Sequence, residues 1–224
     1  MPMTEPRVAV DGRGPAARPA RPPRTDGRLA RALYPLALLG VFVPAALLAW
    51  RAGTGQLLGD VVKILEHETG ELTMRFLAAT LLVTPLRTVT GWNAIAPYRK
   101  LLGNATFLYA SLHLLVFAVV DLELQAGELW EAIVERPYIT VGMLAWAIMV
   151  PLALTSPRAI ARRLGGVRWK ALHRLTYVAA IAGTTHYLWA VKKDTFWPVV
   201  YFALFGLLLL ARLPAVRRRL RRGA

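Results

Sequence analysis

The sequence predicts an all-α membrane protein, a bundle of six transmembrane helices with both termini in the cytoplasm. Of its 224 residues, 56% are hydrophobic, and the mean hydropathy is +0.43. This composition is more apolar than that of an ordinary soluble domain, and the apolar residues come in long runs. The Lys and Arg residues cluster at the ends of these runs, which is typical of membrane proteins.

Six apolar segments each have about the 20 residues that cross the hydrocarbon core of a bilayer. They are residues 32–50, 72–90, 104–120, 138–155, 171–191 and 196–213. Arg75, Pro85 and Pro151 interrupt the second and fourth segments. Arg75 lies close enough to a segment end for its charge to reach the interface, and proline is tolerated in membrane helices.

The distribution of charge sets the orientation of these segments. Most of the 28 Lys and Arg residues lie before the first segment, between the second and third, between the fourth and fifth, or after the sixth. Most of the 13 Asp and Glu residues lie in the other loops. Because cytoplasmic loops carry the excess of Lys and Arg, this alternation places both termini in the cytoplasm.

Two tails flank the predicted membrane domain. Residues 1–28 are rich in Pro, Arg, Ala and Gly without apolar periodicity, which predicts a disordered basic tail. Residues 29–214 form the transmembrane domain, and residues 215–224 form a basic cytoplasmic tail.

Composition also narrows the classes of partner and metal site. The net charge of +15 does not indicate nucleic-acid binding, because the basic residues lie at the ends of apolar segments. We therefore expect membrane lipid, and no nucleic acid, among the partners. The chain has no cysteine, which excludes disulfides, thiolate metal sites and iron–sulfur clusters.

Three of the four histidines lie in apolar segments, namely His113, His173 and His186. An ionisable residue inside a membrane segment is a functional hypothesis by default. In the predicted topology His113 and His186 lie at similar depth on the third and fifth segments. Two such imidazoles can ligate one iron, and the flat ring of haem fits between helices of a bundle. Ligation by two imidazoles leaves no open iron position, which favours electron transfer over oxygen chemistry.

A second haem is suggested at the cytoplasmic level. His173 precedes His186 by about 20 Å along a helix, and Arg99 is placed similarly before His113. His173 would lie on one side of this haem, and Arg99 would bind a propionate or approach the iron. On a regular helix the two histidines face different directions, so the helix must be irregular, for which Gly183 is a candidate, or the haems must be offset.

Each of these residues also has a structural interpretation. A membrane histidine can hydrogen-bond across helices, and His173 can contact lipid headgroups. Arg99, like Arg87, can serve only to set the topology. His67 lies in a predicted polar outer loop between Glu66 and Glu68 and is expected to be a solvated surface residue, with loose binding of a metal ion as the alternative.

Catalytic motifs are absent from the sequence. It contains no dinucleotide-binding glycine motif, P-loop, nucleophile elbow or H-E-x-x-H motif, and we assign no catalytic residue. An electron relay of this kind must take electrons from one partner and give them to another.

Five short motifs follow one another along the chain. They are TPLR at residues 84–87, FLYASLH ending at His113, RPYIT with Gly142 at residues 136–142, LTS at residues 154–156 and WKALHRLTY at residues 169–177. Together they resemble the MsrQ family, formerly called YedZ, the haem-binding membrane subunits of protein-methionine-sulfoxide reductase systems. That family belongs to the ferric-reductase-like transmembrane group. The resemblance covers roughly residues 72–213, and the long N-terminal tail departs from it.

The resemblance implies a ferric-reductase-like haem-binding domain over residues 29–214, in the inner membrane of a bacterium. It implies one or two haem b groups per chain, with FMN as a further cofactor option, and the family's haem ligands map onto His113, His173 and His186. Electrons would come from the quinone pool or a cytosolic flavin reductase. They would pass to a periplasmic molybdopterin-containing methionine sulfoxide reductase subunit that repairs oxidised periplasmic proteins.

Two other functions fit six helices. A stand-alone ferric or oxygen reductase requires an exposed haem with an open iron position, and a proton-coupled transporter would use His113 and Asp121 to carry protons. The depths of the imidazoles and the family resemblance favour the electron carrier. The acidic outer segment, residues 121–135, is the expected docking face for the periplasmic partner.

Overall fold

The computed structural model describes residues 26–191, 193–213 and 215–216, and within these ranges it contains helices and no strands. The all-α prediction is therefore confirmed. The long helices are α1 (Asp26–Gly53), α2 (Val61–Thr90), α3 (Tyr98–Leu115), α5 (Pro137–Leu154), α8 (Leu175–Ala190) and α9 (Phe196–Leu210). The short elements are η1 (Asn93–Ile95), the π-helix η2 (Val116–Asp121), α4 (Ala126–Glu135), α6 (Arg158–Leu164) and α7 (Gly166–Leu172).

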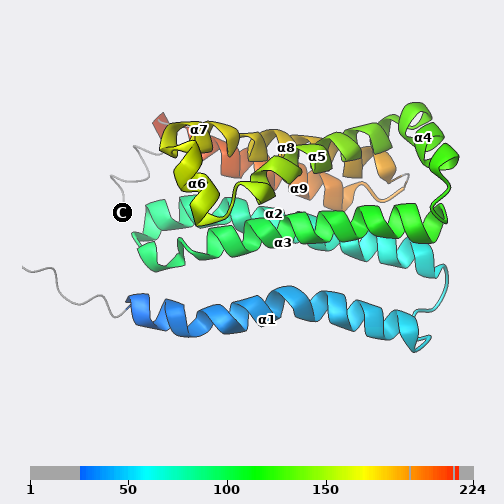
Figure 1. Cartoon of the computed structure of the whole chain (residues 1–224), viewed down its shortest axis with the longest axis horizontal. Helices are drawn as coiled ribbons and strands as arrows, with labels where there is room; N and C mark the ends of the chain where they lie inside the picture. Colours follow the sequence, from blue (N-terminus) through cyan, green and yellow to red (C-terminus); the bar gives the residue numbers. More distant parts are fainter. Residues whose placement is uncertain (1–25, 192, 214, 217–224) are drawn as a thin grey trace, which may run out of the picture.

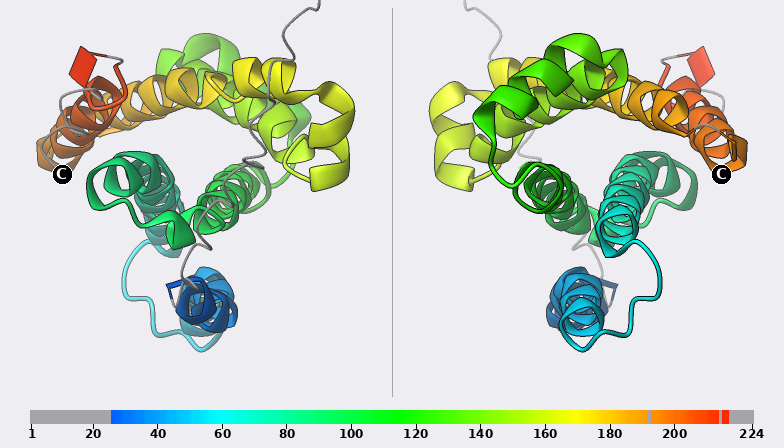
Figure 2. Two further views of the ribbon diagram at one scale, coloured as in Figure 1. Left: turned by 90° about the vertical axis from the view of Figure 1, so that its left-hand side faces the viewer. Right: turned by 90° about the vertical axis from the view of Figure 1, so that its right-hand side faces the viewer.

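The long helices run along one common axis and form three layers (Figure 1). Seen along that axis, α1 stands alone on one side, α2 and α3 form the middle layer, and α5, α8 and α9 form an arc on the other side (Figure 2). The functional cavities described below lie between the middle layer and the arc.

Four of the described helical stretches are long and apolar enough to cross a membrane, as expected of a multi-pass membrane protein. They are α1, α2, the stretch from Asn93 to Asp121, and α5. The predicted fifth and sixth segments correspond to α8 and α9, which have 16 and 15 residues. Both helices are shorter than predicted.

The helix boundaries differ from the prediction at two N-terminal ends. Helix α2 begins at Val61 rather than at residue 72, because Asp60 caps it by accepting a hydrogen bond from the Lys63 amide at 3.1 Å. Helix α1 begins at Asp26, so the end of the predicted disordered tail is helical. The rest of that tail, and residues 217–224, lie outside the described residues.

The predicted segment 171–191 is interrupted near its start. Helix α7 ends at Leu172 and α8 begins at Leu175, so that His173 and Arg174 form a turn between them. Gly183, the candidate position for an irregularity between the two histidines, lies within the regular helix α8. His173 and His186 therefore do not share one helix.

Tyr109 of α3 attaches α1 to the bundle. Its side chain is fully buried and stacks on Phe76 of α2 with ring centroids 5.0 Å apart. The hydroxyl donates to the Val41 carbonyl at 2.6 Å and accepts from the Ala45 amide at 3.1 Å. These two groups are normally partners in a helix, so the hydroxyl is inserted into the backbone of α1 beside Pro44.

Pro85 creates an unsatisfied carbonyl in α2 that a distant arginine satisfies. Proline has no amide proton, so the Leu81 carbonyl lacks its usual partner four residues on. Arg212, just beyond α9, donates to this carbonyl at 2.5 Å and to the Tyr177 hydroxyl at 3.1 Å. Its guanidinium also lies 5.2 Å from the centroid of the Tyr177 ring. Arg212 thus connects α2, α8 and the end of α9.

We expect Arg212→Met to destabilise the folded protein by about 1–3 kcal/mol, because the Leu81 carbonyl then stays buried without a donor. The measurement is unfolding of the purified protein in detergent. Arg163→Met is the matched control, since the Arg163 side chain is exposed and makes no hydrogen bond within the described ranges. Equal stability of the two variants would contradict this assignment.

Candidate functional site

Two cavities lie between the helix layers, and we call them the outer and inner cavity after the predicted orientation. The outer cavity has a volume of about 360 Å³ and is lined by residues of α2, α3, α5 and α8, among them His113 and His186. The inner cavity has a volume of about 580 Å³ and is lined among others by Arg99 and His173. Both volumes are within the range of about 300–1,000 Å³ that is usual for ligand and cofactor sites.

The structure brings His113 of α3 and His186 of α8 together across the outer cavity. Their ring centroids are 6.1 Å apart, and the ring planes are inclined by 74°. This pairing was predicted from the similar depths of the two residues. Within the described residues, no group of three or more His, Asp or Glu side chains could hold a metal ion.

Both imidazoles are oriented by backbone carbonyls of a neighbouring helix. The Nδ1 atom of His113 donates to the Glu66 carbonyl of α2 at 2.9 Å, and Nδ1 of His186 donates to the Tyr138 carbonyl of α5 at 2.6 Å. Because a carbonyl can only accept, each Nδ1 carries the proton and each Nε2 keeps a free lone pair. Metal-ligating histidines use this same arrangement, with the second nitrogen bonded to a carbonyl or carboxylate.

A glycine makes each of these contacts sterically feasible. A Cβ atom at Gly70 would lie 3.3 Å from Cε1 of His113, and a Cβ atom at Gly142 would lie 2.7 Å from Nδ1 of His186. In both cases the glycine follows the accepting carbonyl by four residues. A helical side chain leans over the preceding turn, so any larger residue at these positions would cover the carbonyl that the histidine uses.

The inner cavity holds one imidazole. The His173 ring stacks on Trp169, with centroids 4.0 Å apart, and its Nε2 lies 3.2 Å from the Thr155 hydroxyl. The other three histidines of the chain all line the outer cavity. His173 and Arg99 therefore share a cavity as predicted, but no second imidazole faces His173.

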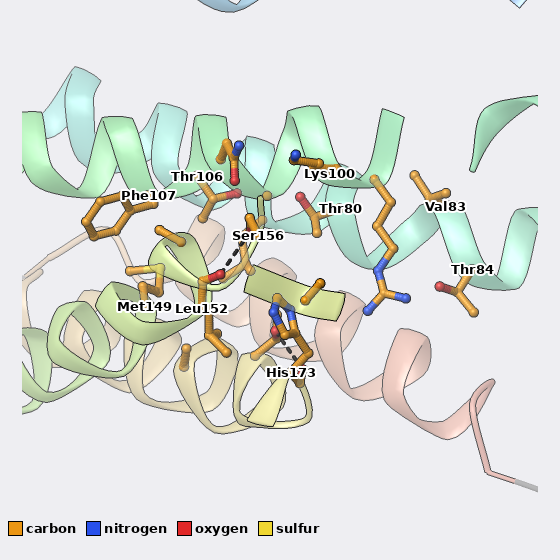
Figure 3. A pocket seen from close by; sticks show the side chains of 18 of the residues that line it. Thr80, Val83, Thr84, Lys100, Thr106, Phe107, Met149, Leu152, Ser156 and His173 are labelled. Carbon is orange, nitrogen blue, oxygen red and sulfur yellow. Dashed lines mark hydrogen bonds between the residues drawn. The ribbon is translucent and has the colours of Figure 1, made fainter. Parts of the chain in front are cut away.

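The lining of the inner cavity is basic and rich in hydroxyl groups. Figure 3 shows labelled side chains of α2, α3 and α5 projecting into the space beside His173. Among the residues that the structure describes, four basic residues and no carboxylate line this cavity. The basic residues are Arg87, Arg99, Lys100 and Arg158. This charge suits a ligand that carries carboxylate or phosphate groups.

The two cavities adjoin each other at α5. Met149 lines both of them. Phe107 on the inner side stacks on Trp146 on the outer side, with centroids 6.2 Å apart, and the Trp146 indole donates to the Ser111 hydroxyl at 3.0 Å. Packed aromatic and thioether groups thus separate the cavities.

The sequence identified the histidines but missed the residues that position them. Gly142 belongs to a quoted motif, yet its contact with His186 depends on how α5 packs on α8. Gly70 and the two accepting carbonyls carry no signal in the sequence. The His67 side chain is exposed as predicted, but it also lines the outer cavity, 6.5 Å from the Tyr187 ring.

Comparison with known proteins places this site in a family. The family model described as a ferric reductase like transmembrane component matches residues 69–184, which include His113 and His173. A protein of Rhodospirillum rubrum, named protein-methionine-sulfoxide reductase heme-binding subunit MsrQ, is 42% identical over 200 residues, covering 87% of this chain and 96% of that protein. The chain belongs to the MsrQ family. MsrQ proteins of Brucella ovis and Brucella canis are each 44% identical over 180 residues, covering 80% of this chain and 81% of theirs.

Proposed function

We propose that this chain is the transmembrane electron-transfer subunit of a methionine sulfoxide reductase system in a bacterial inner membrane. Electrons from the quinone pool or a cytosolic flavin reductase would pass through haem b to a periplasmic molybdopterin-containing reductase that repairs oxidised proteins. The observation that carries this proposal is the pair of oriented imidazoles, His113 and His186, in the outer cavity. The relatives named above as haem-binding subunits support it.

The separation of the pair suits a single iron that His113 and His186 would hold between them. Two imidazoles that bind one metal from opposite sides at about 2.0–2.1 Å have ring centroids roughly 6 Å apart, since the nitrogen lies about 1 Å from its ring centre. The observed separation is 6.1 Å. Bound there, haem supplies a one-electron redox change at its iron. His113 and His186 would both hold the iron, and this argues against a stand-alone ferric or oxygen reductase, which requires an open position.

The inner cavity is the proposed place of a second cofactor. His173 would ligate a second haem from one side, and Arg99 would bind a propionate, with Arg87 and Lys100 nearby. The absence of an opposing imidazole in this cavity keeps FMN as the alternative occupant, since the basic residues would equally bind its phosphate. One or two haem b groups per chain therefore follow from the same two cavities.

The proposed topology retains six spans and cytoplasmic termini. Helices α8 and α9 run alongside α1, α2, α3 and α5, between the two ends of the bundle (Figure 1). They are antiparallel to each other. Helix α7 and the turn at His173 precede α8 on the basic side. The haem-binding domain would thus comprise α1 to α9, flanked by two basic tails.

Helix α4 is the proposed docking face for the periplasmic subunit. It lies beside the outer cavity, because Asp121 before it and Arg136 after it both line that cavity. Its exposed side chains include Trp130, and carboxylates gather on and before it. They are Asp121, Glu123, Glu128, Glu131 and Glu135.

We expect the purified protein to contain low-spin haem whose absorption bands are lost in His113→Ala and in His186→Ala. The measurement is the oxidised and dithionite-reduced spectrum with haem quantified per chain. His173→Ala should remove about half of the haem if the inner cavity holds a haem, and none if it holds FMN, while His67→Ala is the control that keeps the full spectrum. Unchanged spectra in the His113 and His186 variants would rule out the proposed ligands.

Gly142→Ala should lower the haem content while leaving the fold intact. The added methyl group would lie 2.7 Å from Nδ1 of His186, so the ring must move away from the Tyr138 carbonyl that orients it. Haem per chain and the melting temperature in detergent are the two measurements. Gly206→Ala is the matched control, because nothing lies within 4 Å of its added methyl group. Full haem content in Gly142→Ala would show that this orientation is dispensable.

Replacing Glu123, Glu128 and Glu131 together with Gln should slow electron delivery to the periplasmic subunit on the order of 10-fold at low salt. The effect should shrink at high salt, because screening weakens the attraction in the unmodified protein. Stopped-flow oxidation of the reduced chain by the partner measures this rate. An unchanged rate at low salt, with an unchanged haem spectrum, would show that docking does not use this acidic face.

A further inference from the structure

Glu71 of α2 is a buried carboxylate in a membrane-crossing helix, and the proposed function gives it no role. Its residue exposure is 8%, and it is the only charged residue that is buried within the described ranges. The carboxylate accepts hydrogen bonds from the Tyr201 hydroxyl at 2.7 Å, from Nε of Arg75 at 3.2 Å and from the Tyr187 hydroxyl at 3.4 Å. All three partners act as donors, which is the arrangement that an ionised carboxylate requires.

The ion pair between Glu71 and Arg75 is asymmetric with respect to the outer cavity. Glu71 lines that cavity, whereas Arg75 does not. The side chain of Glu71 is 9% exposed and that of Arg75 is 61% exposed. The negative charge therefore lies at the wall of the outer cavity, whereas the positive charge lies outside the lining and acts on the cavity from farther away. The net field that the pair creates in the outer cavity is negative.

Glu71 is connected to both histidines of the outer cavity. Gly70, the preceding residue, is the glycine against which the His113 ring packs. Tyr187, which donates to Glu71, directly follows His186 in α8. The carboxylate and both histidines line the same cavity, so its charge lies close to the pair without contacting it.

We propose that Glu71 lowers the reduction potential of the group held between His113 and His186, and that Arg75 partly offsets this effect. In the proposed function, an electron from the donor adds negative charge to the outer cavity. The negative carboxylate makes this addition less favourable. The site becomes a stronger reductant toward the outer partner, to which the same electron is passed. This inference rests on the proposed function. Glu71 would act only through the electric field of its charge, and it would contact neither the iron nor a substrate.

The test is a redox titration of the haem bands in the full-length purified protein. Glu71→Gln keeps the size of the side chain and an acceptor for the two tyrosines but removes the charge. It should raise the ratio of reduced to oxidised haem about tenfold at a fixed applied potential, which is about 59 mV for a one-electron couple. Arg75→Gln should shift the potential in the opposite direction and by less.

The matched control is Glu68→Gln. Glu68 lies on the same helix and carries the same charge, but it does not line the outer cavity, so its replacement should leave the potential unchanged. If Glu71 only fastened α2 to α8 and α9, its Gln variant would change the melting temperature and leave the potential where it was. That outcome, or shifts of the same sign in the Glu71 and Arg75 variants, overturns the inference.

The experiment also separates this inference from the function on which it rests. A wild-type protein without haem would defeat the proposed function, whereas a haem-loaded protein with an unresponsive potential would defeat only the role of Glu71. If Glu71→Gln fails to retain haem, Arg75→Gln decides the question. A lowered potential in Arg75→Gln then supports the inference, and an unchanged or raised one contradicts it.

Discussion

The hydrogen bonds from the imidazole Nδ1 atoms to backbone carbonyls are the interaction on which the outer cavity depends. They fix the tautomer of His113 and His186, and with it the nitrogen that remains available to a metal. Each bond requires two helices to approach until a histidine reaches the backbone of its neighbour. Glycine at positions 70 and 142 permits that approach, so the packing of α2 on α3 and of α5 on α8 follows from the same requirement.

The sequence predicted the helices and the histidine pair but could not predict how either is held. Long apolar runs and the alternation of charge are local signals, and the depth of His113 and His186 follows from them. The interruption at His173 and Arg174 was not predicted, because a polar pair at the end of an apolar segment can equally lie within a continuous helix that reaches the interface. Likewise, the role of Arg212 depends on the carbonyl that Pro85 leaves free in a helix distant in sequence, which only the packed structure reveals.

The two cavities differ in the chemistry that their residues can supply. The outer cavity offers one buried carboxylate and two oriented imidazoles, one on each of two facing helices. The inner cavity offers one imidazole stacked on Trp169 and a set of basic side chains without a carboxylate. The sequence predicted two imidazoles at the outer level and His173 with Arg99 at the inner level, but it did not predict the stacking of His173 on Trp169.

The histidine pair is divided between two helix pairs, one carried by α2 and α3 and the other by α5 and α8. Each helix pair completes its own hydrogen bond and its own glycine contact without help from the other. A group that binds both imidazoles joins two preassembled halves, and its binding free energy adds directly to the stability of the folded chain. A chain without that group would lack this contribution, and its two helix pairs would be held together by the packing of α2 on α8 and α9 and by the hydrogen bonds of Arg212 and Glu71.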